Sequence, residues 1–95
     1  MLIDHENAQA LLLRALSLSK LKAISESAVT YREATRINIY FFEAYKGLVE
    51  TLILLNHTKD AIQIAANALK LLGTNHRTLA VIFYLYLLFY YLNVY

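Results

Sequence analysis

The sequence predicts an all-α fold in which helix–turn–helix hairpins stack into a solenoid. Residues of similar kind recur at a spacing of 34, a period typical of helical hairpins that must stack because one hairpin cannot bury its own apolar face. The chain has no proline and two glycines, too few turn residues for a β-sandwich or barrel. Apolar residues also recur three and four positions apart, which is the helical period. The pairs related by the repeat are Ala10 and Ala44, Leu18 and Leu52, Leu21 and Leu55, Tyr31 and Ala65, Ala34 and Ala68, and Ile37 and Leu71.

Composition limits the classes of function. The 95 residues suffice for one small domain or a piece of a larger protein. The net charge of +2 is spread along the chain, so it lacks the basic surface of a nucleic-acid-binding protein. There is no cysteine, which excludes disulfides and thiolate metal ligands and fits an intracellular protein. The amino terminus lacks a basic stretch before an apolar one, so we expect no secretory signal.

The first half of the chain predicts two helices. Apolar residues at helical spacing from about 7 to 21 indicate the first, and we take residues 1–24 as a weak amino-terminal helix. Ser25 and Ser27 are expected N-caps of the second helix. The residues expected on the buried face of the second helix are Ala28, Tyr31, Ala34 and Ile37, with Arg32, Glu33 and Arg36 outside.

The second half predicts two further helices. The third is expected over 40–55 and the fourth after a turn at 56–58, with Thr58 as its N-cap. Asp60 should favour its first turn through the helix dipole. Gly73 lies where a helix needs a residue with positive φ to end. The expected buried face of the third helix is Tyr45, Leu48, Val49, Leu52 and Leu55, and the apolar stripe of the fourth is Ala61, Ile62, Ala65, Ala68, Leu69 and Leu72.

The second repeat matches the tetratricopeptide pattern in residue type as well as length. Such units carry large residues in the first helix, small residues in the second, and a helix stop after it. Those places hold Tyr45, Leu48, Ala61, Ala68 and Gly73, and the second helix of the first repeat supplies Tyr31 and Ala34, although Ser27 stands where alanine is expected. The small residues let paired helices approach closely, while the large ones fill the seam. We therefore predict tetratricopeptide-like repeats over 25–75, with Gly47 serving close packing or lining a groove.

The sequence predicts a hydrophobic and aromatic terminal helix over 76–95, which is uncharged after Arg77 and capped by Thr74 or Asn75. Residues 78–95 carry no charged side chain and come close to the lower limit of length for crossing a bilayer. Several tyrosines within the segment disfavour a tail anchor, because their hydroxyl groups prefer the membrane interface. Alternatively, Leu79 and Ile82 occupy the places of Tyr45 and Leu48 in a third repeat, or the final residues are an extension foreign to the fold.

No pattern in the chain predicts catalysis, a cofactor or a metal site. The three histidines His5, His57 and His76 lie in separate turns or termini, whereas a metal needs convergent ligands. There is no nucleophile elbow and no glycine-rich phosphate loop. We therefore expect a non-enzymatic protein whose function lies in its surface.

The candidate binding surface is the groove that the first helices of stacked repeats line. In the second repeat its expected residues are Glu43, Lys46, Glu50 and Ile53. Lys46 and Glu50 are also four positions apart on one helix, so the alternative interpretation is a solvated ion pair.

Three segments carry a more specific resemblance: YREATRIN at 31–38, FEAYKGLVE at 42–50 and LGTNHRTLA at 72–80. With these the chain resembles the subunit 7 family of tetratricopeptide scaffolds in the anaphase-promoting complex (cyclosome), a ubiquitin ligase. The resemblance implies a short fragment of a non-catalytic subunit with a nuclear role in the cell cycle and mitosis. It also implies partners among sister tetratricopeptide subunits and a second copy of itself. From 81 onward the chain departs from the family pattern, being more aromatic and uncharged.

Two other functions remain open. A generic tetratricopeptide module that binds acidic peptides needs basic groove residues, and the expected groove offers only Lys46 between two acids. A small tail-anchored membrane protein with a helical head would use residues 78–95 as its anchor.

Overall fold

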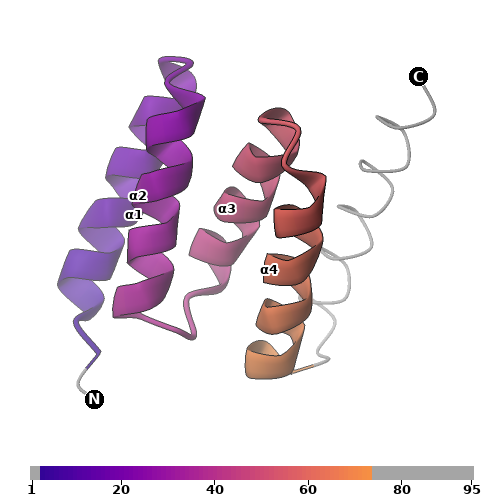
Figure 1. Ribbon diagram of the computed structural model, residues 1–95. Helices are drawn as coiled ribbons and strands as arrows, with labels where there is room; N and C mark the ends of the chain where they lie inside the picture. The colour runs from indigo at the N-terminus through magenta and orange to yellow at the C-terminus, as the bar shows by residue number, and fades with distance from the viewer. Residues whose placement is uncertain (1–2, 74–95) are drawn as a thin grey trace.

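The computed structural model describes residues 3–73, which form four α-helices: α1 (His5–Lys20), α2 (Ile24–Ile37), α3 (Phe42–Leu54) and α4 (Thr58–Leu72). The helices follow one another side by side in chain order (Figure 1). Each packs on the next along the chain, and α1 also contacts α3. The predicted all-α solenoid of two helical hairpins is therefore confirmed. The expected fifth helix and the tail from 76 onward lie outside the described residues.

Acidic side chains stabilise the beginnings of two helices. Asp4 is the N-cap of α1, where its Oδ1 accepts a hydrogen bond from the backbone N–H of Asn7 at 3.0 Å. Its Oδ2 accepts another from the side-chain Nδ2 of Asn7 at 2.7 Å. Glu6 and Asp60 lie in the first turns of α1 and α4, where a negative charge is favourable, as predicted for Asp60.

The predicted N-caps of α2 and α4 are wrong. α2 follows Ala23, which makes no side-chain cap bond, so both Ser25 and Ser27 lie inside the helix. α4 follows His57 and already includes Thr58, and it too lacks a side-chain cap bond. The reason is that the tight backbone turn ending the previous helix also sets the start of the next one.

The turns after α1 and α3 have the same backbone form. Lys22 and Asn56 occupy equivalent positions in successive repeats and have φ values of 67° and 63°. The N–H after each reaches back into the preceding helix, to the carbonyl of Leu18 at 2.9 Å and of Leu52 at 2.8 Å. This is the Schellman ending, which normally uses glycine at the positive-φ position. Gly73 after α4 has the predicted positive φ, at 82°.

A continuous core runs through the row of helices. Its members are Leu12, Ala15, Ala28, Tyr31, Ala34, Ala44, Leu48, Val49, Leu52, Ile53 and Ala61. The expected buried faces of α2 and α3 agree, except that Ile37 and Leu55 are half-buried. In α4 only Ala61 and Ala68 are buried, and Ile62 is 43% exposed. The predicted apolar stripe of α4 is therefore only partly covered within residues 3–73.

Candidate protein-interaction surface

Small residues bring the two helices of the first hairpin close together. The contact between α1 and α2 includes Ala15 and Ser27, both 0% exposed. The Ser27 hydroxyl donates to the carbonyl oxygen of Ala15 at 2.8 Å, crossing from α2 to α1. Ser27, which stands in place of the expected alanine, is small enough for this contact, and its hydroxyl has a hydrogen-bond partner. A buried hydroxyl needs such a partner.

The two hairpins are joined by a contact between the Tyr31 ring and the backbone of Gly47. A Cβ at Gly47 would overlap the ring carbons Cε1 and Cζ of Tyr31 and lie 2.8 Å from Cδ1. Tyr31 on α2 is only 4% exposed, so its ring fills the space that a side chain on α3 would need. Of the two roles expected for Gly47, close packing is the one shown. This contact sets how α3 lies on the first hairpin.

Two buried hydroxyl groups of α3 are satisfied by backbone carbonyls. The Tyr45 hydroxyl donates to the carbonyl of Ile39 in the α2–α3 turn at 2.8 Å. Burial raises the pKa of Tyr45 above its ordinary value. Thr51 is 2% exposed, and its hydroxyl lies 3.0 Å from the carbonyl of Gly47 and 2.9 Å from that of Leu48. The sequence analysis did not single out Thr51, because the spacing of apolar residues identifies a buried face and a polar residue on that face does not contribute to the pattern.

The expected repeat-packing residues lie largely inside the protein. Tyr31, Ala34, Tyr45, Leu48, Ala61 and Ala68 are each 8% exposed or less. Gly73, in contrast, is exposed at the end of α4.

The expected groove residues of α3 are not equally accessible. Lys46 is exposed, and Glu43 and Glu50 are half-buried. Ile53 is 5% exposed and belongs to the core, so it offers almost no surface to a partner. Burial, with a smaller effect of the Glu50 carboxylate, raises the pKa of Tyr31. Within residues 3–73 no ion pair joins Lys46 to Glu50; the pair that forms is Arg36 to Glu33, at 3.1 Å.

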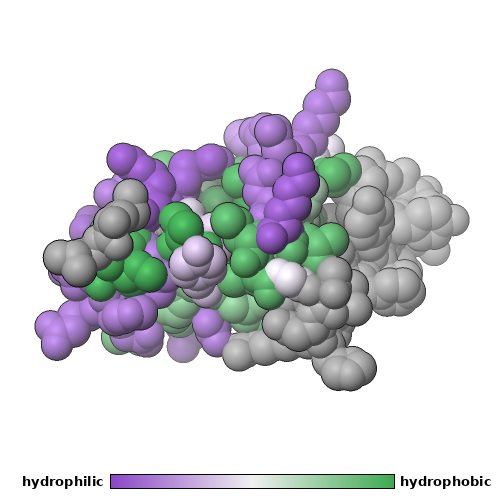
Figure 2. Space-filling model, turned by 90° about the horizontal axis from the view of Figure 1, so that it is seen from below, coloured by the Kyte–Doolittle hydropathy of each residue, from purple (hydrophilic) through white to green (hydrophobic). Residues whose placement is uncertain are grey.

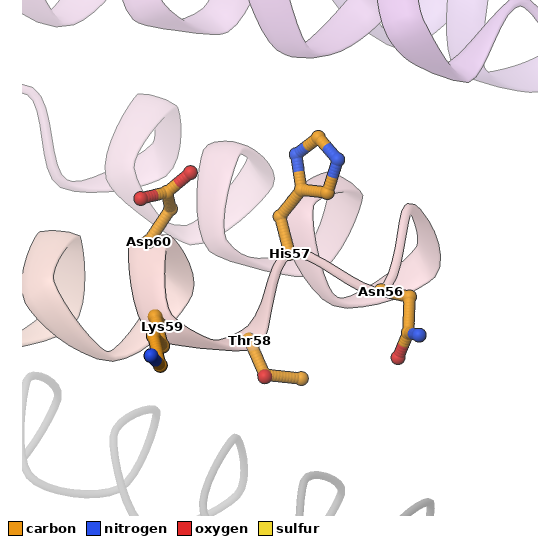
Figure 3. Close-up of a pocket in the computed structure, with 5 residues that line it drawn as sticks. All are labelled: Asn56, His57, Thr58, Lys59 and Asp60. Atoms are coloured by element: carbon orange, nitrogen blue, oxygen red, sulfur yellow. The ribbon is translucent and has the colours of Figure 1, made fainter.

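The turn between α3 and α4 forms a shallow hollow lined by residues 56–60. In Figure 3 the side chains of His57 and Asp60 rise on one side of the chain, while Asn56, Thr58 and Lys59 lie on the other. These groups diverge and do not converge on a common point. Across residues 3–73 there is no cluster of three or more histidine and acidic side chains that could hold a metal ion.

Apolar groups reach the surface at several places. Figure 2 shows them gathered across the middle of the lower end of the molecule, with polar side chains towards the α1 side. The most exposed large apolar side chains of residues 3–73 are Leu21 at 76%, Val29 at 69% and Leu54 at 66%. Within the described range, none of the helices has the length and apolar character needed to cross a bilayer.

The amino-acid sequence of this chain is similar to that of known proteins. It is 31% identical over 80 residues to anaphase-promoting complex subunit 7 of Homo sapiens, and to the same extent to that of Mus musculus. The chain is homologous to a segment of that subunit. The match takes in 84% of this chain but only 14% of the length of subunit 7. No protein-family model and no solved structure matches the chain.

The homology and the fold agree with the resemblance read from the sequence. The 80 matched residues overlap the tetratricopeptide-like hairpins and correspond to a short stretch of the much longer subunit 7.

Proposed function

We propose that this chain is a non-catalytic scaffold that binds other subunits of an anaphase-promoting complex. The observation that carries the proposal is the homology to subunit 7 over 80 residues, in a chain that folds as stacked helical hairpins. Stacked hairpins of this kind present extended surfaces to other proteins. The nuclear and cytoplasmic location and the role in the cell cycle are part of the same proposal.

The contact surface we assign is the polar side of α3 around Lys46, with Glu43 and Glu50 beside it. Lys46 is exposed and lies between two acidic residues on the same helix, so the surface is charged but nearly balanced. Such a surface fits a folded partner with mixed charges better than a strongly acidic peptide tail. The partners we propose are other tetratricopeptide subunits and a second copy of this chain.

The test is binding of the purified full chain to individually purified tetratricopeptide subunits of an anaphase-promoting complex, measured by biolayer interferometry. Lys46→Glu should weaken binding by about threefold to tenfold, or about 0.7–1.4 kcal/mol. Lys70→Glu is the matched control, because Lys70 is also exposed but lies in the last turn of α4.

The result separates two parts of the proposal. If the chain binds none of these subunits, the scaffold function is wrong. If it binds and both variants bind like the wild type, the scaffold function stands and the assignment of the surface to α3 is wrong.

A further inference from the structure

One apolar face of α4, which includes Ala65 at the edge of the core, has a counterpart in α2 that is covered by the next helix along the chain. Residues 28, 31, 35 and 38 share the helix face from which Tyr31 packs on α3, and all four are 9% exposed or less. The equivalent positions in the next repeat are Ile62, Ala65, Leu69 and Leu72. All four are apolar, Ile62 is 43% exposed, and the other three are half-buried. The equivalent face of α4 is thus more apolar than that of α2 and more exposed.

The chain continues from 74 to 95 beyond the described range, and the repeat places 76–88 opposite this face, where α3 lies opposite α2. The positions of α3 that are buried in the core include 44, 45, 48, 49, 52 and 53. Their counterparts in the segment 76–88 are aliphatic or aromatic residues, apart from Thr78 at the first position. Because nearly every residue of this segment is apolar, these matches alone do not distinguish this register from others.

The discriminating observation is the pair that replaces Tyr31 and Gly47. In the described contact a large ring on α2 fills the space left by a residue without a side chain on α3. At the equivalent positions one repeat later the chain has Ala65 and Val81. The large and small partners have exchanged sides: where α4 loses the ring, the following segment gains a β-branched side chain. Such compensation favours a contact between residues 65 and 81, since close packing penalises both overlap and voids.

We propose that residues 76–88 of this same chain cover the apolar face of α4, in the register in which α3 covers α2, with Val81 against Ala65. Burying this face within the chain removes an apolar patch that would otherwise favour binding to another protein or to a membrane. It also gives the third hairpin its first helix. The proposal does not depend on the identity of any partner.

Because the chain has no cysteine, pairs of introduced cysteines test the register cleanly. The full chain carrying Ala65→Cys and Val81→Cys is treated with a short bismaleimide at low protein concentration, and links are mapped by peptide mass spectrometry. The control pair is Ala65→Cys with Phe83→Cys. Residue 83 lies two positions along, on the opposite side of a helix from residue 81, just as the buried Val49 lies opposite Gly47 on α3 and so faces away from Tyr31. The proposal expects the 65–81 link within one chain to form about tenfold faster than the 65–83 link, as effective concentration falls for a misdirected group.

Three outcomes overturn the proposal. Equal rates for the two pairs mean that residues 65 and 81 do not face each other. Links between chains mean that a second copy covers α4. Loss of the 65–81 link together with flotation of the chain on phosphatidylcholine vesicles means that the segment enters a membrane.

A size-exchange experiment checks the packing independently. Ala65→Tyr should lower the stability of the full chain, and adding Val81→Gly should restore most of the loss by recreating the Tyr31–Gly47 pair. Failure of Val81→Gly to rescue Ala65→Tyr contradicts the proposed contact. Both experiments use the purified chain alone, so their failure is distinguishable from failure to bind other subunits.

Discussion

Gly47→Ala tests the contact that joins the two hairpins. A methyl group at this position would overlap two carbons of the Tyr31 ring and lie 2.8 Å from a third. Carbon atoms pack favourably about 3.5–4.0 Å apart, so the ring must move away. It has little room to do so, because Tyr31 is 4% exposed.

Two effects of the substitution oppose each other. Overpacking a core by one methyl group costs about 1–3 kcal/mol. Alanine is favoured over glycine within a helix by about 0.8–1.0 kcal/mol. We therefore expect Gly47→Ala to lower the free energy of unfolding by about 1 kcal/mol, measured by urea denaturation followed by circular dichroism with an unchanged m-value.

A double-mutant cycle isolates the steric term. With Tyr31→Leu in place the ring is gone, and adding Gly47→Ala should then stabilise the protein through helix propensity alone, by about 0.8–1.0 kcal/mol. Ala66→Gly is the matched control, because Ala66 is exposed within α4 and reports the propensity difference in this chain. The reasoning is refuted if Gly47→Ala stabilises the wild type as much as it stabilises the Tyr31→Leu variant.

Three further predictions concern the turns, the hairpin seam and the tyrosines. Lys22→Gly should raise the free energy of unfolding by about 0.5–1 kcal/mol, because glycine adopts a positive φ without strain. Asn56→Gly should raise it by less, because asparagine tolerates a positive φ. An unchanged urea midpoint for Lys22→Gly would contradict the strain assigned to Lys22. Ser27→Ala should cost about 0.5–1.5 kcal/mol through its lost hydrogen bond, whereas Ser25→Ala on the exposed surface should leave the urea midpoint nearly unchanged. Since burial raises the pKa of Tyr45 in the folded state, stability should hold below about pH 10 and fall as the pH rises through that folded pKa, because the unfolded chain loses the proton first. Tyr45→Phe should reduce this alkaline loss, seen in urea midpoints measured across that range; an equal loss in the variant would assign it to other groups.

The four helices of residues 3–73 and the buried faces of α2 and α3 followed from the sequence because both are local properties. The spacing of Ala28, Tyr31 and Ala34 defines one face of a helix whatever it packs on, and all three are buried. The positive φ at Gly73 was equally predictable, since glycine tolerates it without strain. Lys22 adopts a positive φ without being glycine, so its residue type gave no sign of it; asparagine at position 56 tolerates this conformation but does not require it.

The partners of individual side chains were settled by the tertiary structure. Ser27 reads as an N-cap in sequence, yet it lies within α2 and its hydroxyl binds a carbonyl of α1. Ile53 reads as a groove residue, yet it lies in the core. Both outcomes depend on how closely two helices approach, which no residue determines alone.

The 34-residue repeat, the helical period and the lack of turn residues determined that this chain forms stacked helical hairpins. These features act over a single helical turn or recur along the chain, so they are visible without coordinates. That the Tyr31 ring lies on the backbone of Gly47 was decided only when α2 and α3 packed together. Such a contact reflects the rigid-body fit of two helices, and that fit depends on every side chain between them.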